Sequence, residues 1–143
     1  MARQLHLEVV TPDRQVIGKP VDYVGAPGLL GEFGILPGHV PFLSALGIGS
    51  LHYKLAGRNY YVFVSGGFAE ISGDRVMVLA EVAELPEEID VDRAKRARER
   101  ALHRLESERR ERVDYARAKA ALQRSIMRMK CREESRLAGT GGM

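Results

Sequence analysis

Residue types that often bind phosphate or move protons gather in residues 31–41. This stretch contains three glycines, two prolines and His39 within eleven residues. A P-loop requires G-x-x-x-x-G-K-[ST] at the start of a helix, and a dinucleotide site requires G-x-G-x-x-G between a strand and a helix. The first motif is absent, and in the second His52 stands where a third glycine would follow Gly47 and Gly49. The stretch therefore predicts a rigid backbone corner shaped by glycine and proline, and not a phosphate cradle.

His39 leaves two interpretations open. A catalytic histidine acts with a nucleophile or an orienting carboxylate, yet no Asp, Ser or Cys adjoins His39 in the sequence. The alternative is a partly buried polar residue in a turn, which the sequence favours. The single cysteine, Cys131, excludes an intramolecular disulfide and a cysteine-ligated zinc site, and we expect it to be an inert thiol. The sequence thus supplies no catalytic residue and no metal ligand.

Length and charge limit the classes of protein that this chain can be. It has 143 residues, of which 45% are hydrophobic, enough for one ordinary domain or two small ones. No apolar run approaches the roughly 18 residues of a membrane span, and the N-terminus lacks a signal-peptide pattern. Residues 1–86 contain 6 Lys and Arg against 8 Asp and Glu, a net charge of −2, whereas residues 87–143 contain 16 against 11, a net charge of +5. We therefore expect the basic second half to meet an acidic surface or an anionic ligand.

Residues 1–86 predict an antiparallel β-sandwich. Leu5, Leu7 and Val9 alternate with polar residues in the period-2 pattern of a half-buried strand. Turn signals recur about every eight to twelve residues, which is typical of sandwiches and barrels. We expect the second strand to end where Gly18 and Pro20 interrupt it.

Residues 87–143 predict an antiparallel α-helical hairpin, because no Gly or Pro occurs between residues 87 and 138. Asp90 is placed to cap a helix that begins near Val91, and the polar residues 107–111 would connect it to a second helix over about 112–130. We expect the tail to fray from about residue 134. The predicted inner faces are Ala94, Ala97, Ala101 and Leu105 on the first helix, and Tyr115, Ala118, Leu122, Ile126 and Met129 on the second.

The alanine-rich seam between the two helices leaves two hypotheses open. Each buried methyl contributes only about 0.8 kcal/mol, so the hairpin would be marginal on its own. It is either a static hairpin docked on the sandwich, or an element that detaches and extends at low cost, as a switch requires.

Four stretches, taken together and in this order, identify a family. They are GEFGILPGHVPFL (residues 31–43), VSGGFAE (64–70), VMVLAEVAE (76–84) and IDVDRA (89–94). A turn-rich β domain that carries them and is followed by an alanine-rich helical hairpin resembles the epsilon subunit of bacterial F-type ATP synthase. The resemblance covers nearly the whole chain, from about Leu5 to Lys130.

The resemblance implies a non-catalytic rotor subunit in the central stalk of a proton- or sodium-translocating ATP synthase. In this family the sandwich binds the gamma subunit and sits on the ring of c subunits, and Glu32 falls in the loop implied to contact that ring. The hairpin permits ATP hydrolysis when it is folded down. When it extends along gamma, it reaches the alpha and beta subunits and inhibits hydrolysis. The implied location is the cytoplasmic face of the bacterial plasma membrane, with membrane association only through the complex.

The resemblance also implies a regulatory ATP site on the folded-down hairpin, with no cofactor required. Some members carry I/L-D-x-x-R-A on the first helix, present here at residues 89–94, and A-L-x-R-x-x-x-R on the second, present here at residues 121–128. Arginines one turn apart share a helix face, where their guanidinium groups can hold a polyphosphate. Nothing in the pattern holds Mg²⁺ or an attacking water, so ATP would be sensed and not hydrolysed. The implied binding residues are Glu84, Asp90, Arg93, Arg100, Arg124 and Arg128.

Simpler functions remain as alternatives at this stage. Taken alone, Asp90 is explained as a helix cap and the arginines as a solvated helix face. The basic hairpin could instead form a nucleic-acid-binding module, but acidic residues are interleaved with the basic ones and no aromatic stacking platform accompanies them. An enzyme would need a nucleophile–base pair or a metal cluster, which the sequence does not supply. We therefore expect no nucleic-acid partner.

Overall fold

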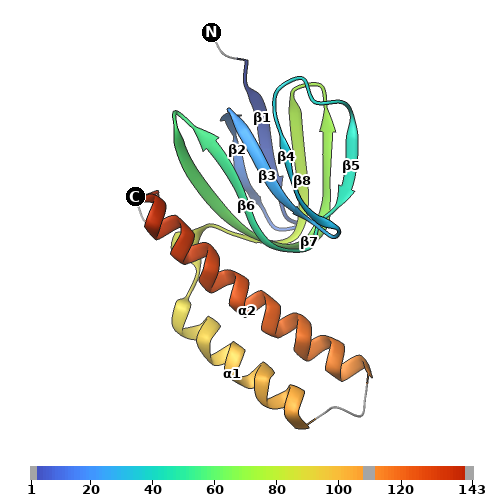
Figure 1. The fold of residues 1–143 in the computed structure, drawn as a ribbon, viewed down its shortest axis with the longest axis vertical. Helices are drawn as coiled ribbons and strands as arrows, with labels where there is room; N and C mark the ends of the chain where they lie inside the picture. The colour runs from blue at the N-terminus through green and yellow to red at the C-terminus, as the bar shows by residue number, and fades with distance from the viewer. Residues whose placement is uncertain (1–2, 108–111, 141–143) are drawn as a thin grey trace.

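The computed structural model describes residues 3–107 and 112–140. Strands occupy the first part of the chain and two helices the last, with a short 3₁₀ turn, η1, between them (Figure 1). The elements are β1 (Leu5–Val10), β2 (Gln15–Val21), β3 (Tyr23–Gly28), β4 (Gly31–Ile35), β5 (Phe42–Ala45), β6 (Ile48–Leu55), β7 (Arg58–Ser72), β8 (Arg75–Glu84), η1 (Pro86–Glu88), α1 (Val91–Ser107) and α2 (Arg112–Ala138).

The strands form one continuous sheet in the order β2-β1-β8-β7-β6-β3-β4, with β5 paired to β7. Neighbouring strands run antiparallel except β1 and β8, which run parallel with Leu7 opposite Val76. The sheet folds over so that β2 approaches β6, and its two layers enclose the core (Figure 1). The predicted sandwich followed by a helical hairpin is confirmed.

The sandwich core consists of the alternating apolar residues of several strands. Leu5, Leu7 and Val9 of β1 are fully buried, as the period-2 pattern predicts. The prediction that Gly18 and Pro20 end the second strand is wrong, because β2 continues to Val21. Since β2 pairs only with β1 and forms an edge of the sheet, the missing proline donor costs no ladder hydrogen bond there.

The glycine- and proline-rich stretch is only partly the corner that we predicted. Its first half is a regular strand, β4, which pairs with β3 from Gly31 to Ile35. The irregular corner is confined to residues 36–41, where the His39 amide donates to the Leu36 carbonyl at 3.2 Å. His39 therefore lies in a turn, and its Nδ1 is 2.7 Å from the Val40 carbonyl oxygen. This agrees with the structural interpretation of that histidine.

Helix α2 is longer than predicted. It continues past Lys130 to Ala138, and the tail from residue 134 is helical, so the prediction of a frayed tail there is wrong. The extra turns are held by the sandwich, since the Thr140 hydroxyl donates to the Asn59 carbonyl at 2.7 Å. Of the predicted connection at 107–111, residues 108–111 lie outside the described part of the chain.

The inner face of α2 also differs from the prediction. Ala118 is buried as predicted, but Tyr115 and Ile126 are 42% and 44% exposed. Ser125 and Ser135 are buried in their place. Small side chains allow α2 to approach α1 on one side and the sheet on the other, whereas larger ones would hold the elements apart.

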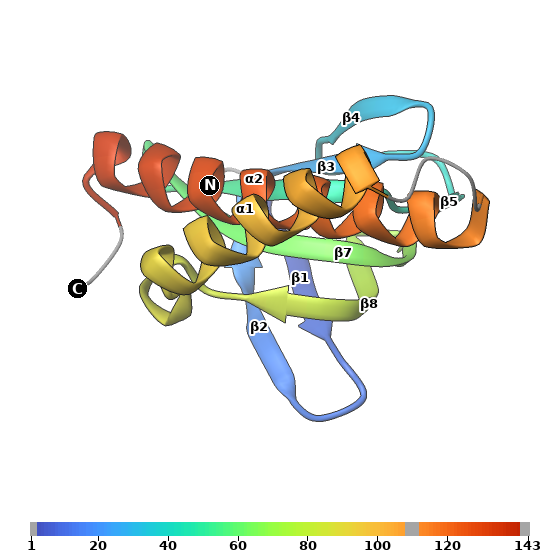
Figure 2. The ribbon, with the colours of Figure 1, turned by 90° about the horizontal axis from the view of Figure 1, so that it is seen from below.

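The hairpin lies across one end of the sandwich (Figure 2). α2 packs against β6, β7 and η1, while α1 packs mainly on α2. A second, smaller apolar cluster lies between α2 and the sandwich, with Phe63, Ile89 and Cys131 at its centre. Polar contacts border it, since Ser50 donates to Glu134 at 3.1 Å and Arg132 donates to the Pro86 carbonyl at 2.8 Å. Among the described residues, no helix has the length and apolarity needed to cross a membrane.

Candidate functional site

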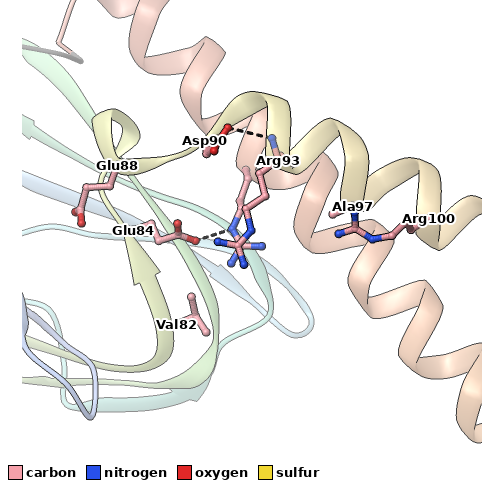
Figure 3. Close-up of a pocket in the computed structure, with 9 residues that line it drawn as sticks. Val82, Glu84, Glu88, Asp90, Arg93, Ala97 and Arg100 are labelled. Carbon is pink, nitrogen blue, oxygen red and sulfur yellow. Dashed lines mark hydrogen bonds and ion pairs between the residues drawn. The ribbon is translucent and has the colours of Figure 1, made fainter.

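A cavity of about 420 Å³ lies where the last strand of the sandwich meets the hairpin. Its walls come from β8, the η1 turn and both helices (Figure 3). A volume of this size is within the range of small-molecule sites. The lining residues are Val82, Glu84, Glu88, Asp90, Arg93, Ala94, Ala97, Arg100 and Arg128.

Arg128 joins the helix α2 wall to the sandwich wall. Its Nε donates to Oε1 of Glu84 at 2.5 Å, and both side chains are 27% exposed. Its guanidinium carbon lies 4.7 Å from the centre of the Phe63 ring. An ion pair and a cation–π contact fix the side chain in a half-buried position. The remaining guanidinium donors are then available to a ligand in the cavity.

Asp90 sets the start of α1 at the rim of the cavity. Its carboxylate accepts a hydrogen bond from the Arg93 amide at 3.0 Å, and its carbonyl accepts one from the Ala94 amide at 3.0 Å. This N-cap satisfies amides that would otherwise be unpaired at the first turn. The cap places the positive end of the helix dipole at the cavity that Glu84 also lines, and the Arg93 side chain extends from this end of the helix into the cavity wall (Figure 3).

Arg93 and Arg100 add two further guanidinium groups to the cavity wall. Neither guanidinium forms an ion pair with any residue that the structure describes. They lie two turns apart on one face of α1, about 10 Å along the helix axis. With Arg128 on the opposite wall, the cavity presents guanidinium groups from both helices. This arrangement suits an extended anion such as a polyphosphate.

Glu88 is a cavity residue that sequence reasoning missed. Arg14, on the β1–β2 turn, holds it with Nη2 at 2.8 and 2.6 Å from the two carboxylate oxygens. The hydrogen bond from Arg14 keeps the pKa of Glu88 below its usual value, and a further bond from the Leu85 amide at 3.2 Å acts in the same direction. The pair ties η1 to the sandwich. No pattern in the sequence could link residues so far apart in the chain.

The cavity gathers most of the predicted ATP-binding residues. Glu84, Asp90, Arg93, Arg100 and Arg128 all line it, whereas Arg124 does not. Arg124 lies one turn before Arg128 on α2 and is partly buried. The one-turn spacing of the two arginines on α2 therefore does not place both at the cavity, and only Arg128 lines its wall.

Glu32 lies on β4, beside the exposed β3–β4 turn. Its side chain is 63% exposed, and its Oε1 lies 3.4 Å from Nδ1 of His52. Leu29 and Leu30 in the adjoining turn are 68% and 105% exposed. This tip combines an accessible carboxylate with uncovered apolar side chains, as a protein contact requires. In the described part of the chain, no group of three or more His, Cys, Asp or Glu side chains is placed to hold a metal ion.

Two family models match consecutive parts of the chain. The ATP synthase delta/epsilon chain β-sandwich domain matches residues 4–86, and the long α-helix domain of the same chain matches residues 87–131. The ATP synthase epsilon chain of Nitratidesulfovibrio vulgaris (strain DP4) is 63% identical over 105 residues, 73% of this chain and 78% of that one. The epsilon chain of Lawsonia intracellularis is 54% identical over 105 residues, 73% of this chain and 79% of that one.

Solved structures of ATP synthases contain similar chains. A chain in the OSCP/F1/c-ring structure of Euglena gracilis mitochondrial ATP synthase superposes with a TM-score of 0.76 and 25% identity, covering 94% of this chain and 81% of that one. A chain in the central stalk/c-ring structure of Tetrahymena thermophila mitochondrial ATP synthase has a TM-score of 0.58 at 11% identity, covering 91% and 97%. The second likeness concerns the fold alone.

Proposed function

The chain belongs to the ATP synthase delta/epsilon chain family, and from this premise we propose that it is the epsilon subunit of a bacterial F-type ATP synthase. As such it is a non-catalytic part of the central stalk, on the cytoplasmic face of the plasma membrane and held there through the complex. The two consecutive family matches and the identity to bacterial epsilon chains support this assignment.

The sandwich supplies two surfaces for rotor partners. On one face Phe68 of β7 and Leu79 of β8 pair across the strands and are 55% and 53% exposed. They border a shallow, mainly apolar hollow, and an uncovered apolar surface of this kind marks a protein contact. We assign this face to the gamma subunit. The tip with Glu32, Leu29 and Leu30 is assigned to the polar loops of the c-ring.

Capture by gamma tests the subunit assignment. We expect the full chain to co-purify with gamma, and a Phe68→Ser/Leu79→Ser double variant to lose most of that binding, because both substitutions remove apolar area from the contact. Leu137→Ser is the matched control, since Leu137 is 73% exposed but lies at the far end of α2. Capture of the double variant at the level of Leu137→Ser would contradict this choice of face, and failure of the unaltered chain to bind gamma would contradict the subunit assignment.

The hairpin is proposed to regulate ATP hydrolysis, with ATP as the ligand that favours the docked position. The observation that carries this proposal is the composition of the 420 Å³ cavity, whose walls include β8, α1 and α2. A ligand held by residues of both parts binds only while the hairpin is docked, so it must shift the equilibrium toward that state. In the extended state the basic helices would face acidic residues of the beta subunit.

Cys131 provides a direct measure of docking. It lies on α2 in the apolar cluster with Phe63 and is fully buried, and burial raises the pKa of its thiol to about 12. Once the hairpin leaves the sandwich, the thiol gains solvent and returns toward its ordinary pKa of about 8.5, where the reactive thiolate is far more abundant. We expect slow reaction with a thiol reagent, and slowing by about tenfold when ATP saturates the cavity.

Chemical denaturation gives the control rate for a fully accessible thiol in that experiment. Modification of the folded chain at this control rate would show that the contact between α2 and the sandwich does not shield Cys131. A slow rate of modification that does not change when ATP is added would show that the hairpin is docked but that ATP does not stabilise the docked state. ATP would then not be the ligand of the arginine-lined cavity.

A further inference from the structure

A second cavity, of about 280 Å³, adjoins the η1 turn and shares no lining residue with the first. Its walls are the edge strand β2, strands β6 and β7, η1, and the C-terminal end of α2 with the residues after it. It therefore also spans the boundary between sandwich and hairpin. Neither its residues nor its position belong to the arginine-lined cavity.

Both signs of charge border this cavity. Lys19 on β2 and Glu87 in η1 line it, and neither forms an ion pair with any residue that the structure describes. Nζ of Lys19 lies 5.8 Å from the centre of the Tyr53 ring. Because Lys19 and Glu87 do not pair with each other, each can form an ion pair with an oppositely charged group of one ligand bound in the cavity.

Two stacked tyrosine rings line the same cavity. The Tyr53 and Tyr60 rings stack at 5.1 Å with an interplanar angle of 10°. Burial first, and then the neighbouring Tyr60 and Glu87, raise the pKa of Tyr53 to about 12. The Tyr53 phenol is therefore neutral at physiological pH and can donate a hydrogen bond. Tyr53 is only 4% exposed, so the packing around it holds its ring in place.

Apolar side chains complete the cavity. Val16 and Ile17 of β2 and Leu85 and Pro86 beside η1 line its remaining surface. A body of aliphatic groups with a few converging polar groups is the usual composition of a small-molecule site. The volume suits a ligand of amino-acid size and is too small for a nucleotide.

We propose that this cavity binds a small zwitterion of the α-amino-acid type, with its carboxylate toward Lys19, its ammonium toward Glu87 and an aliphatic side chain against the apolar wall. Because Thr140 and Ser135 close the cavity from the hairpin side, the ligand is released when the hairpin leaves. Binding therefore stabilises the docked hairpin by linkage. The consequence for ATP hydrolysis rests on the proposed function, whereas the binding itself does not.

Calorimetric titration of the full chain with three related probes tests the site. L-leucine carries both charged groups, 4-methylpentanoate lacks the ammonium, and 3-methylbutylamine lacks the carboxylate. We expect L-leucine to bind, and each of the other probes to bind at least about tenfold more weakly, because one charge of the cavity is then left unpaired. Equal binding of either analogue, or no heat from L-leucine, would overturn the proposal.

Matched variants locate the binding in this cavity. Lys19→Met and Glu87→Gln are expected to weaken L-leucine binding about tenfold each. Lys54→Met is the control, since Lys54 lies over the Tyr23 ring at 5.4 Å, a similar contact outside the cavity. Unchanged binding in both cavity variants would refute the site. ATP titration of the same samples keeps this outcome separate from the proposed function, because the arginine-lined cavity contains neither Lys19 nor Glu87.

Discussion

An assembled ATP synthase whose copy of this chain ends at Glu88 is expected to hydrolyse ATP about tenfold faster than the enzyme with the full chain. The truncation removes α1 and α2, the elements proposed to reach the alpha and beta subunits, and leaves β1 to β8 complete. Hydrolysis is measured at steady state on purified enzyme, with ATP synthesis measured in parallel. Synthesis is expected to continue, because Phe68 and Leu79, the residues proposed to contact gamma, remain.

The control for this truncation is retention of the shortened chain in the purified complex. The loss of α2 uncovers Phe63, which is fully buried in the full chain, so the amount of bound subunit must be quantified. If the complex contains the shortened chain in full and hydrolyses ATP at the original rate, the hairpin does not inhibit. The coupling role of the sandwich would survive that result.

Arg128→Ala is expected to weaken ATP binding to the isolated chain by about tenfold to hundredfold, the usual cost of losing a hydrogen-bonded charge. The substitution removes a guanidinium from the cavity wall, leaves Glu84 unpaired and opens the contact with Phe63. Titration calorimetry with ATP measures the change. Arg124→Ala is expected to have a smaller effect, since Arg124 does not line the cavity.

Arg96→Ala is the matched control for this variant, because Arg96 is exposed on α1 and lies outside the cavity wall. Cys131 reactivity, measured on each variant without ATP, separates a lost ligand contact from an undocked hairpin. Unaltered ATP affinity in Arg128→Ala and in the Arg124→Ala/Arg128→Ala double variant would remove the cavity as the ATP site.

The sequence predicted the architecture because its periodicity is local. Alternation in β1 and the Gly-free run after Pro86 define a sandwich and a helical hairpin without reference to tertiary contacts. Errors arose where a neighbouring element decides the outcome. β4 forms despite its glycines because it pairs with β3. α2 continues to Ala138 because the carbonyl groups of Asn59 and Pro86 accept hydrogen bonds from its last turns and from a residue after it.

The candidate site was predictable only in part for the same reason. The cap at Asp90 and the arginines of α1 follow from spacing along one helix. Arg128 pairs with Glu84, and Arg124 does not. Which of the two arginines does so depends on how α2 is rotated about its axis against the sheet. The small, buried side chains of Ser125 and Ser135 set that rotation. Glu88 was missed because its partner, Arg14, lies at the opposite end of the β part.

The parallel pairing of β1 with β8 has a consequence for the order of folding. The first strand of the sandwich lies between β2 and the last strand, so the sheet cannot be completed during synthesis until β8 has left the ribosome. Contacts of such long sequence separation slow folding, because loop closure precedes any gain from them. The completed sheet, however, contains no residue of α1 or α2. The hairpin thus packs on strands that pair without it, and its detachment need not propagate unfolding into them.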